Sequence, residues 1–332
     1  MRILFVCRDE THASSRVRAL QYVEPLRRLG HDVETLVWQP RRSADVAALG
    51  ARVLVLARRS DVVVLVKPRL HPMVLAALAR VQPNLMVDVD DAVWTWPVPF
   101  PDRFDAAARH ARVLVAGNTF LAERLATRYP SAAVTMVPTA VDTTRYVPAA
   151  RPDAHPIVVG WIGGPNSLAD FVPPATAALR GLVQDGAIAV RVVCSETLDP
   201  AVLPTELVTW SYETEVASLQ AFDIGIMPLC DDESSWGRCG LKALQYMAVG
   251  VPVVATPVGA TEEIIEDGAS GIHATSEDDW RRAIVELARD RARRAEMGAR
   301  ARRRVEEAFS VTANAPRLAA VLGGTPSSPA PK

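Results

Sequence analysis

Residues 237–259 form the stretch that most limits how this chain can fold. Within it, apolar residues recur at the spacing of one helical face over positions 241–248. Gly250 follows, at a point where a residue free to adopt positive φ would end a helix. The next residues, 252–256, form a short apolar run typical of a strand covered on both faces. Helix, tight turn and buried strand in this order predict a parallel sheet with helices packed on it.

The amino end of the helix expected over 241–248 is a candidate anion site. Unpaired N–H groups near Gly240 and Leu241, together with the helix dipole, favour a negative charge. Arg238 and Lys242 flank this end and add two positive charges. A phosphate or diphosphate is the ligand that this arrangement favours, and an ordinary α/β turn with two solvated cations is the alternative.

Short apolar runs bounded by polar or turn residues recur along the chain and predict buried strands. They occupy residues 2–7, 62–66, 84–91 and 112–117, and then residues 157–164, 190–195, 207–212 and 223–229. Helical stretches separate them, which is the pattern of βαβ units. The first unit lacks the G-x-G-x-x-G pattern, and this disfavours a nicotinamide cofactor. With 332 residues and a short proline-containing linker at 149–156, the chain is expected to form two domains.

Charge and cysteine content disfavour several functional classes. The net charge is −1, so the chain as a whole has no basic character that would indicate nucleic-acid binding. Its four cysteines are scattered without the spacing of metal ligands or of a disulfide framework, and we expect buried thiols in a reducing cytoplasm. No apolar run reaches the length of a membrane span, and residues 1–7 predict a strand, not a signal peptide.

Three carboxylates end the strand expected over residues 84–91. Strand alternation places Asp88 and Asp90 on one face. Like charges this close raise each other's pKa, so we expect either a use in chemistry or a cationic partner. Asp91 alone also fits a turn or a helix cap.

Aromatic and proline residues fill the loop over residues 94–101, directly after these aspartates. Because sugars stack on aromatic faces, Trp94 and Trp96 are candidates for a wall that binds an acceptor; a lid packed against its own domain is the alternative. Lys67, Arg69 and His71 also gather at an expected strand end. They form either the cationic wall of a cleft or an exposed loop.

The first helix is expected over residues 14–29, directly after the first strand. Ser14 is expected to cap its amino end. Arg16 lies near the carboxyl end of the strand, where open α/β sheets bind ligands, so this side chain is a candidate for contact with a ligand phosphate.

Two stretches carry a resemblance to a known family. Gly240-Leu241 and residues 247–255 match the donor-site segment of retaining glycosyltransferases of family 4, the glycosyl transferases group 1, and residues 134–148 resemble the interdomain signature of that family. The family has two glutamates eight positions apart in the donor segment, the E-x7-E pattern. Gly237 and Gln245 stand at these positions here, so the chain resembles a divergent branch.

The resemblance implies the GT-B fold, an α/β architecture of two facing Rossmann-like domains with parallel sheets. It implies an acceptor domain over residues 1–150 and a nucleotide-sugar donor domain over residues 151–310. A helix over residues 311–322 would pack back on the first domain. The proline- and serine-rich tail over residues 323–332 is expected to be disordered.

The resemblance also implies a reaction: transfer of a sugar from a nucleotide-diphosphate sugar to a saccharide, a lipid-linked saccharide or a natural product, with retention of configuration and without a metal or another cofactor. Asp90 stands where many members carry a histidine near the reacting sugar, so we expect it to be catalytic. Arg238 and Lys242 would stabilise the departing diphosphate. The expected donor contacts are Gly163, Gly164, Gly237, Gly240, Leu241 and Gln245, and the expected acceptor contacts are Arg16, Asp88, Trp94 and Trp96.

Two other functions fit the same residues. Loss of both family glutamates also fits an inactive GT-B scaffold that binds a nucleotide or a partner enzyme, and a GT-B sugar-nucleotide epimerase is a further alternative. The expected location is the cytoplasm. An arginine-rich helix over residues 291–309 is expected to present a solvated face, and contact with anionic lipid at the inner face of a membrane is the alternative.

Overall fold

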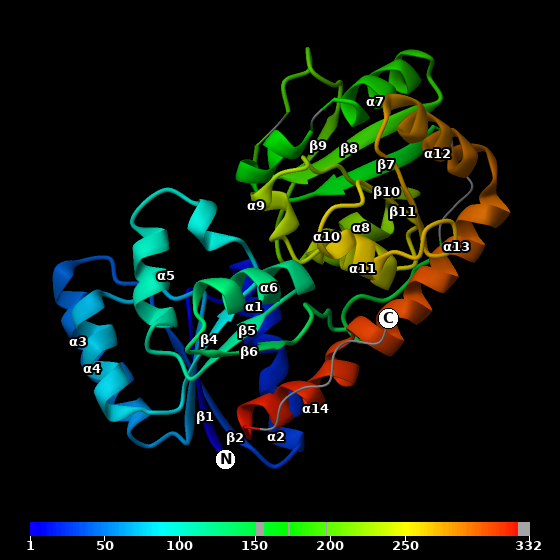
Figure 1. Cartoon of the computed structure of the whole chain (residues 1–332). Coiled ribbons are helices and arrows are strands. Elements are labelled where there is room, and N and C mark those ends of the chain that lie inside the picture. The colour runs from blue at the N-terminus through cyan, green and yellow to red at the C-terminus, as the bar shows by residue number, and fades with distance from the viewer. Residues whose placement is uncertain (151–155, 172, 197, 325–332) are drawn as a thin grey trace. The chain divides into compact units, whose positions relative to one another are not determined.

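A computed structural model describes residues 1–150, 156–171, 173–196 and 198–324, which form two compact units (Figure 1). Unit 1 comprises Met1–Ala140, Trp236–Cys239 and the chain from Val311 onward, and unit 2 comprises Val141–Ser235 and Gly240–Ser310. Most of the linker expected over 149–156 and most of the tail expected over 323–332 lie outside the described residues.

Unit 1 is built on a six-stranded parallel sheet in the order β2-β1-β3-β4-β5-β6. The strands are β1 (Arg2–Cys7), β2 (Asp32–Val37), β3 (Val62–Val66), β4 (Leu85–Val89), β5 (Val113–Ala116) and β6 (Ala133–Met136). The helices are α1 (Ala13–Arg18), α2 (Val23–Arg28), α3 (Ser43–Ala57), α4 (Pro72–Val81), α5 (Phe100–Ala108), α6 (Thr119–Arg128) and α14 (Val311–Leu322), with the short 3-10 helices η1 (Leu20–Tyr22) and η2 (Val93–Thr95).

Helices cover this sheet on both faces, which is why its central strands are apolar throughout. Successive side chains of β1 alternate between two cores. Leu4 and Val6 belong to one core, together with apolar residues of α3 to α6. Ile3 and Phe5 belong to the other core, which α2 and α14 help to close. The buried runs of the sequence therefore predict this sheet correctly.

The first helix differs from its expected form. It is divided into α1, η1 and α2, and Ala19 separates the first two with φ −133° and ψ −66°. The prediction that Ser14 caps it is wrong, because Ser14 lies buried inside α1 and its hydroxyl accepts a hydrogen bond from Lys67 Nζ at 2.9 Å. The turn before α1 is closed by Asp9, whose Oδ1 accepts hydrogen bonds from the backbone N–H groups of Thr11 (3.0 Å) and His12 (2.7 Å).

Unit 2 contains a second six-stranded parallel sheet, in the order β12-β11-β10-β7-β8-β9. Its strands are β7 (Ile157–Ile162), β8 (Ile188–Cys194), β9 (Glu206–Thr209), β10 (Ile224–Met227), β11 (Val253–Ala255) and β12 (Gly271–His273). The helices are η3 (Pro165–Asp170), α7 (Ala175–Gln184), α8 (Glu215–Gln220), α10 (Leu241–Ala248), α11 (Ala260–Ile264), α12 (Glu277–Arg289), α13 (Arg291–Arg304) and η4 (Val305–Phe309), and the short α9 (Glu233–Trp236) ends at the border with unit 1. Gly250 separates α10 from β11 with φ +70°, which confirms the expected turn.

The arginine-rich helix α13 uses several of its guanidinium groups inside unit 2. Arg294 is buried and donates hydrogen bonds to carbonyl groups at the end of α12. Arg302 donates to the carbonyl oxygens of Thr143 (2.9 Å) and Ala248 (2.6 Å). Arg304 donates hydrogen bonds to the carbonyl oxygens of Glu263 and Ile264 in α11. The expectation of a wholly solvated basic face is therefore wrong for these three side chains.

Candidate functional site

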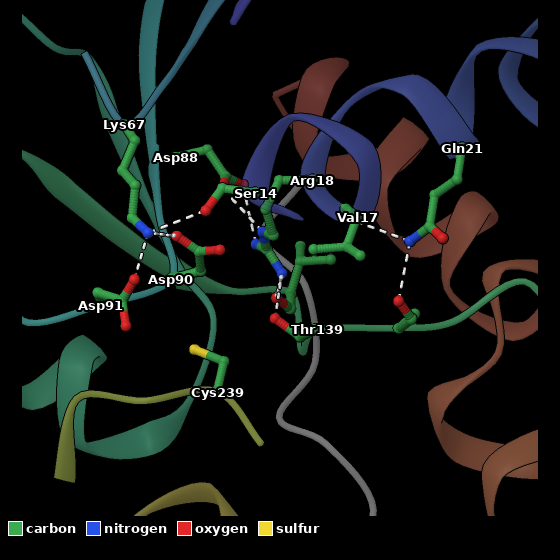
Figure 2. Close-up of polar contacts among 12 residues, drawn as sticks. Ser14, Val17, Arg18, Gln21, Lys67, Asp88, Asp90, Asp91, Thr139 and Cys239 are labelled. Carbon is green, nitrogen blue, oxygen red and sulfur yellow. Dashed lines mark hydrogen bonds and ion pairs between the residues drawn. The ribbon is translucent and has the colours of Figure 1, made fainter. Parts of the chain in front are cut away.

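Lys67 is the centre of a buried polar cluster at the carboxyl ends of β3 and β4 in unit 1 (Figure 2). Its Nζ lies 2.9 Å from Oδ1 of Asp90, forms an ion pair with Asp91, and donates a hydrogen bond to the hydroxyl of Ser14. Only 8% of the Lys67 side chain and 11% of the Asp90 side chain are exposed. Lys67 is therefore a cationic partner of the kind that the run of aspartates predicts.

The backbone of Lys67 is unusual as well. Its φ is +46°, in the left-handed region that residues other than glycine seldom adopt. Its N–H donates a hydrogen bond to the carbonyl oxygen of Asp88 at 2.9 Å, directly beyond the paired part of the two strands. Local strain of this kind clusters at functional sites. The conformation therefore adds to the argument that this sheet edge has a function beyond packing.

The charges in the cluster depend on one another. Burial alone would raise the pKa of Asp90, but Lys67 and Arg18 outweigh it and hold this pKa below its ordinary value. Burial likewise opposes the charge on Lys67, but the carboxylates of Asp90 and Asp91 raise its pKa above its usual range. Burial raises the pKa of Asp91, and Lys67 only partly offsets this. At neutral pH the site therefore presents Asp90 as a carboxylate paired with a charged lysine.

Asp88 lies deeper and is paired with Arg18 of α1 (Figure 2). Two hydrogen bonds of 2.8 Å connect the guanidinium group to both carboxylate oxygens, and Nη1 donates to the carbonyl oxygen of Val137 at 2.9 Å. Both charged side chains are almost fully buried. This contact fixes α1 to β4 and gives Asp88 a structural partner; its expected contact with an acceptor stays a prediction.

The aromatic loop after β4 divides into a packed part and a part that lines a pocket. The ring of Trp94 packs against Phe104, with a centroid separation of 6.5 Å, at the edge of the core. Trp96 meets the edge of Phe100 at 5.8 Å, and Lys67 Nζ lies 4.9 Å from the Trp96 ring centroid. A small pocket opens here, lined by Lys67, Pro68, Arg69, Val93, Trp96, Phe100 and Phe104. Of the two tryptophans, only Trp96 lines this pocket.

Residues 236–239 belong to unit 1 and follow its sheet edge closely. Asn118 Nδ2 donates hydrogen bonds of 3.0 Å to the carbonyl oxygens of Trp236 and Arg238. A Cβ atom at Gly237 would lie 2.5 Å from Ala92 Cβ and 2.6 Å from its backbone nitrogen, so no larger side chain fits here. Burial raises the pKa of Asp91, and the charge of Arg238 opposes this rise, with a smaller effect than those of Lys67 and Asp90. Arg238 is therefore a neighbour of the aspartate cluster.

In unit 2, the loop after β7 and the first turn of α10 come together. A Cβ atom at Gly163 would lie 2.5 Å from the Trp161 ring and 2.9 Å from Lys242 Cε, whereas Gly164 has open space around it. Lys242 Nζ lies 4.7 Å from the Trp161 ring centroid. Gly240 precedes α10 with φ +66°, and Leu241 is the first residue of the helix. These predicted donor residues form one local group with a positive charge.

Gln245 lies on α10 and is 4% exposed. Its Nε2 donates a hydrogen bond to the hydroxyl oxygen of Tyr146 at 3.0 Å, and that hydroxyl binds the buried carboxylate of Glu215. Trp210 Nε1 donates to the other oxygen of Glu215 at 2.9 Å. The amide thus belongs to a buried network, and its expected contact with the donor stays a prediction.

The predicted residues fall into two local groups. Unit 1 contains Arg16 on α1, Asp88, Asp90, Trp94, Trp96, Gly237 and Arg238; unit 2 contains Gly163, Gly164, Gly240, Leu241, Lys242 and Gln245. Sequence reasoning missed Arg18 and Glu215 as partners, although a charged residue next to apolar helix positions was a signal for each. Among the described residues, no group of three or more His, Cys, Asp or Glu side chains is arranged to bind a metal ion. The expectation that no metal is needed stays a prediction.

Comparison with known proteins gives a family match for part of the chain. Residues 190–290 match the family model described as "Glycosyl transferases group 1". A D-inositol 3-phosphate glycosyltransferase of Corynebacterium aurimucosum is 38% identical over 85 residues, which are 25% of this chain and 19% of the relative. One from Thermobispora bispora is 28% identical over 176 residues, 52% of this chain and 36% of the relative. The matched segments thus span well under half the length of these relatives.

The solved structures show a likeness over nearly the whole chain. The structure of Anabaena HepE in complex with UDP and glucose superposes with a TM-score of 0.70 at 16% sequence identity, and covers 98% of this chain and 100% of that protein. At this identity the likeness shows the fold. Together with the two six-stranded parallel sheets, it confirms the expected α/β architecture of the GT-B class.

Proposed function

We propose that this chain is a glycosyltransferase that moves a sugar from a nucleotide-diphosphate sugar to an acceptor. The observation that carries the proposal is the match of residues 190–290 to the glycosyl transferases group 1. This segment contains Gly240, the amino end of α10 and Lys242, the residues that the sequence predicts to bind an anion. Membership of the retaining family 4, as a branch without the E-x7-E glutamates, belongs to the same proposal.

The donor site is proposed to lie in unit 2. The N–H groups at the start of α10 and the ammonium group of Lys242 suit a diphosphate, because the positive end of the helix dipole and the lysine both favour negative charge. Gly163 allows the backbone after β7 to lie close to Lys242, and Gly164 leaves room beside it. These groups would stabilise the charge that develops on the diphosphate as the sugar departs. We also propose Arg238, two positions before Gly240 in the sequence, as a second cation for the diphosphate.

Asp90 is the proposed catalytic carboxylate. A pKa held below the ordinary value makes a carboxylate a weak general base at neutral pH, because efficient bases have a pKa near the working pH. The same ionised state suits a hydrogen bond to a sugar hydroxyl, or stabilisation of positive charge on the sugar ring. We therefore propose the electrostatic role for Asp90. Retained configuration at the transferred carbon is proposed from the resemblance to the retaining family 4 alone.

One observation favours a second function, an inactive scaffold. Gly237 has no room for a side chain, and Gln245 is buried against Tyr146, so neither position offers the carboxylate that the related family uses. A protein of this kind would bind a nucleotide or a partner enzyme without turnover. Nucleotide binding and sugar transfer, measured separately, distinguish this function from the proposed enzyme and from an epimerase.

The first experiment is a calorimetric titration of the whole chain with UDP, GDP, ADP, CDP and TDP. One of them should bind, and Lys242→Ala should weaken that binding about ten- to a hundredfold, the usual value of a charged hydrogen bond. Arg289→Ala is the matched control, since it removes one exposed positive charge from the same unit. Equal affinities in the two variants would defeat the diphosphate assignment.

The sugar nucleotide of the base that binds is then incubated with candidate acceptors, and the products are separated. Transfer of the sugar supports the glycosyltransferase, isomerised donor supports the epimerase, and binding without turnover supports the scaffold.

No helix in the described part of the chain is long and apolar enough to cross a membrane. A cytoplasmic location, contact with the inner face of a membrane and a role in cell-envelope or polysaccharide synthesis are further predictions.

A further inference from the structure

A cluster of arginines lies at the carboxyl ends of β1 and β3 in unit 1, outside the residues discussed as catalytic. These strands are parallel neighbours, with Val6 paired to Leu65, so the segments that follow them leave the sheet at one edge. Arg8 follows β1 directly and Arg69 follows β3. Arg103 of α5 joins them, because its Nη1 donates a hydrogen bond to the carbonyl oxygen of Arg69 at 3.3 Å.

The positive charges in this cluster exceed the negative ones. Arg8 forms an ion pair of 3.3 Å with Asp9. Among the residues that the structure describes, neither Arg69 nor Arg103 has a carboxylate partner. The guanidinium group of Arg69 lies instead over the ring of Phe100, 4.3 Å from its centroid. A planar cation fixed on an aromatic face keeps its N–H groups at the ring edge available to an anion.

The electrostatic surroundings of Arg69 agree with this. Burial lowers the pKa of Arg69, and the neighbouring charges of Arg8 and Arg103 lower it further, to about 10, against a smaller opposite effect of Asp9. The group is still charged at neutral pH. Half-buried cations that repel one another disfavour the folded state, and a bound anion would relieve this repulsion.

We propose that Arg69, with Arg8 and Arg103, binds a phosphate group at this edge of unit 1. Several guanidinium groups suit the oxygens of a phosphate, which accept paired hydrogen bonds. Arg69 also lines the small pocket beside Trp96 and Phe100, so the phosphate site would adjoin aromatic rings. If the proposed function holds, this ligand is the acceptor, a phosphorylated saccharide or the phosphate headgroup of a lipid.

Inorganic phosphate is the first probe, titrated by calorimetry into the whole chain. Arg69→Gln should weaken phosphate binding about ten- to a hundredfold. Arg80→Gln should leave it unchanged, because Arg80 is exposed in the last turn of α4, away from this cluster. Lys242→Ala should also keep the Arg69-dependent binding. If phosphate binds equally well to the Arg69 and Arg80 variants, or not at all to the wild type, the site does not exist.

A second arm separates the two sources of phosphate. Vesicles of phosphatidic acid in phosphatidylcholine are sedimented with each variant, and vesicles of phosphatidylcholine alone are the control. If the protein binds these vesicles and Arg69→Gln binds them less, the ligand is a lipid phosphate. If the protein binds inorganic phosphate but does not bind the vesicles, the ligand is a free phosphorylated compound. The melting temperature of Arg69→Lys is measured to test whether a change of fold explains the loss of phosphate binding. This variant keeps the positive charge, so if it folds it should retain part of the phosphate affinity.

The phosphate site and the proposed function can fail separately. Arg69→Gln should leave nucleotide affinity unchanged, since Arg69 is not among the proposed donor residues, and Gly240 and Lys242 of that group lie in unit 2. If phosphate binding depends on Arg69 but no nucleotide binds, the phosphate site exists and the proposed glycosyltransferase function is wrong. If the protein turns over a sugar nucleotide but does not bind phosphate, the proposed function holds and the phosphate site does not exist.

Discussion

Lys67 and Asp90 show at the scale of single residues how burial and pairing set a charge state. Both side chains lie almost out of solvent, where either charge alone would be costly. Their contact of 2.9 Å makes the ionised pair favourable. The lysine is also the residue with positive φ at the end of β3, so backbone conformation and charge pairing coincide at one position. Its removal should therefore alter chemistry as well as packing.

Lys67→Met should move the acidic limb of the activity profile to higher pH. In the wild type, Lys67 helps to hold the pKa of Asp90 below its ordinary value, so the carboxylate persists as the pH falls. Without the lysine, burial dominates and raises this pKa, and the limb should rise by about one to three pH units. Asp90→Asn should instead lose turnover at every pH and keep its nucleotide affinity. An unchanged profile in Lys67→Met would exclude the proposed dependence.

At the scale of elements, the Arg18–Asp88 pair connects α1 to β4. Arg18→Met should lower the stability of unit 1 by about 3–5 kcal/mol at neutral pH, because it leaves a buried carboxylate without its partner. The loss should shrink in acid, where Asp88 becomes protonated and no charge is buried. Urea unfolding of the wild type and Arg18→Met at pH 7 and at pH 4 measures the loss of unfolding free energy at each pH.

The double variant Arg18→Met with Asp88→Leu serves as the control for this pair. It removes both charges, so it should be more stable than Arg18→Met alone. If the single and double variants unfold at the same urea concentration, the uncompensated charge is not the cause.

Gln245→Glu, which introduces the glutamate of the family that the sequence resembles, should destabilise unit 2. The amide now donates to Tyr146, whose hydroxyl binds Glu215; a carboxylate at position 245 would have no such donor. Burial near Glu215 would raise the pKa of the new carboxyl above its unfolded value of about 4.3. The variant should match the wild type below that pH and lose about 2–4 kcal/mol as the pH rises to 7.

Urea unfolding across this pH range, with Gln245→Ala as a reference whose loss does not change with pH, tests the argument. Equal stability of Gln245→Glu and the wild type at pH 7 would mean that position 245 tolerates the family carboxylate. The donor contact that the sequence predicts for position 245 would then gain support.

The sequence predicts some of these elements well and others poorly, for physical reasons. Apolar runs such as Val62–Val66 identify buried strands because strands of a parallel sheet are covered on both faces. The pairing of Arg18 with Asp88 is a contact between residues 70 positions apart, which local patterns do not encode. The aspartate run indicated a charged site, but neither its partner Lys67 nor the absence of space at Gly237 follows from spacing.

At the scale of the whole molecule, unit 1 is assembled from distant parts of the chain. Leu318 and Val321 of α14 are buried in the core that contains Ile3 and Phe5. A chain that ends at residue 310 should therefore expose apolar surface of this core. It should melt at a lower temperature than the whole chain, because several buried core contacts are lost. A chain that ends at Gly324 is the control. Equal melting of the two would show that α14 does not stabilise unit 1.

The division of the chain has a consequence for synthesis on the ribosome. The chain passes between the two units four times, at Ala140–Val141, Ser235–Trp236, Cys239–Gly240 and Ser310–Val311. Residues 1–140 are made before unit 2 is complete, yet the core that contains Ile3 and Phe5 is incomplete until α14 is made. Because domains generally fold as they leave the ribosome, the early part of this protein must wait, with apolar surface uncovered, while all of unit 2 is translated. Chaperones can therefore bind this uncovered apolar surface for as long as unit 2 is being translated.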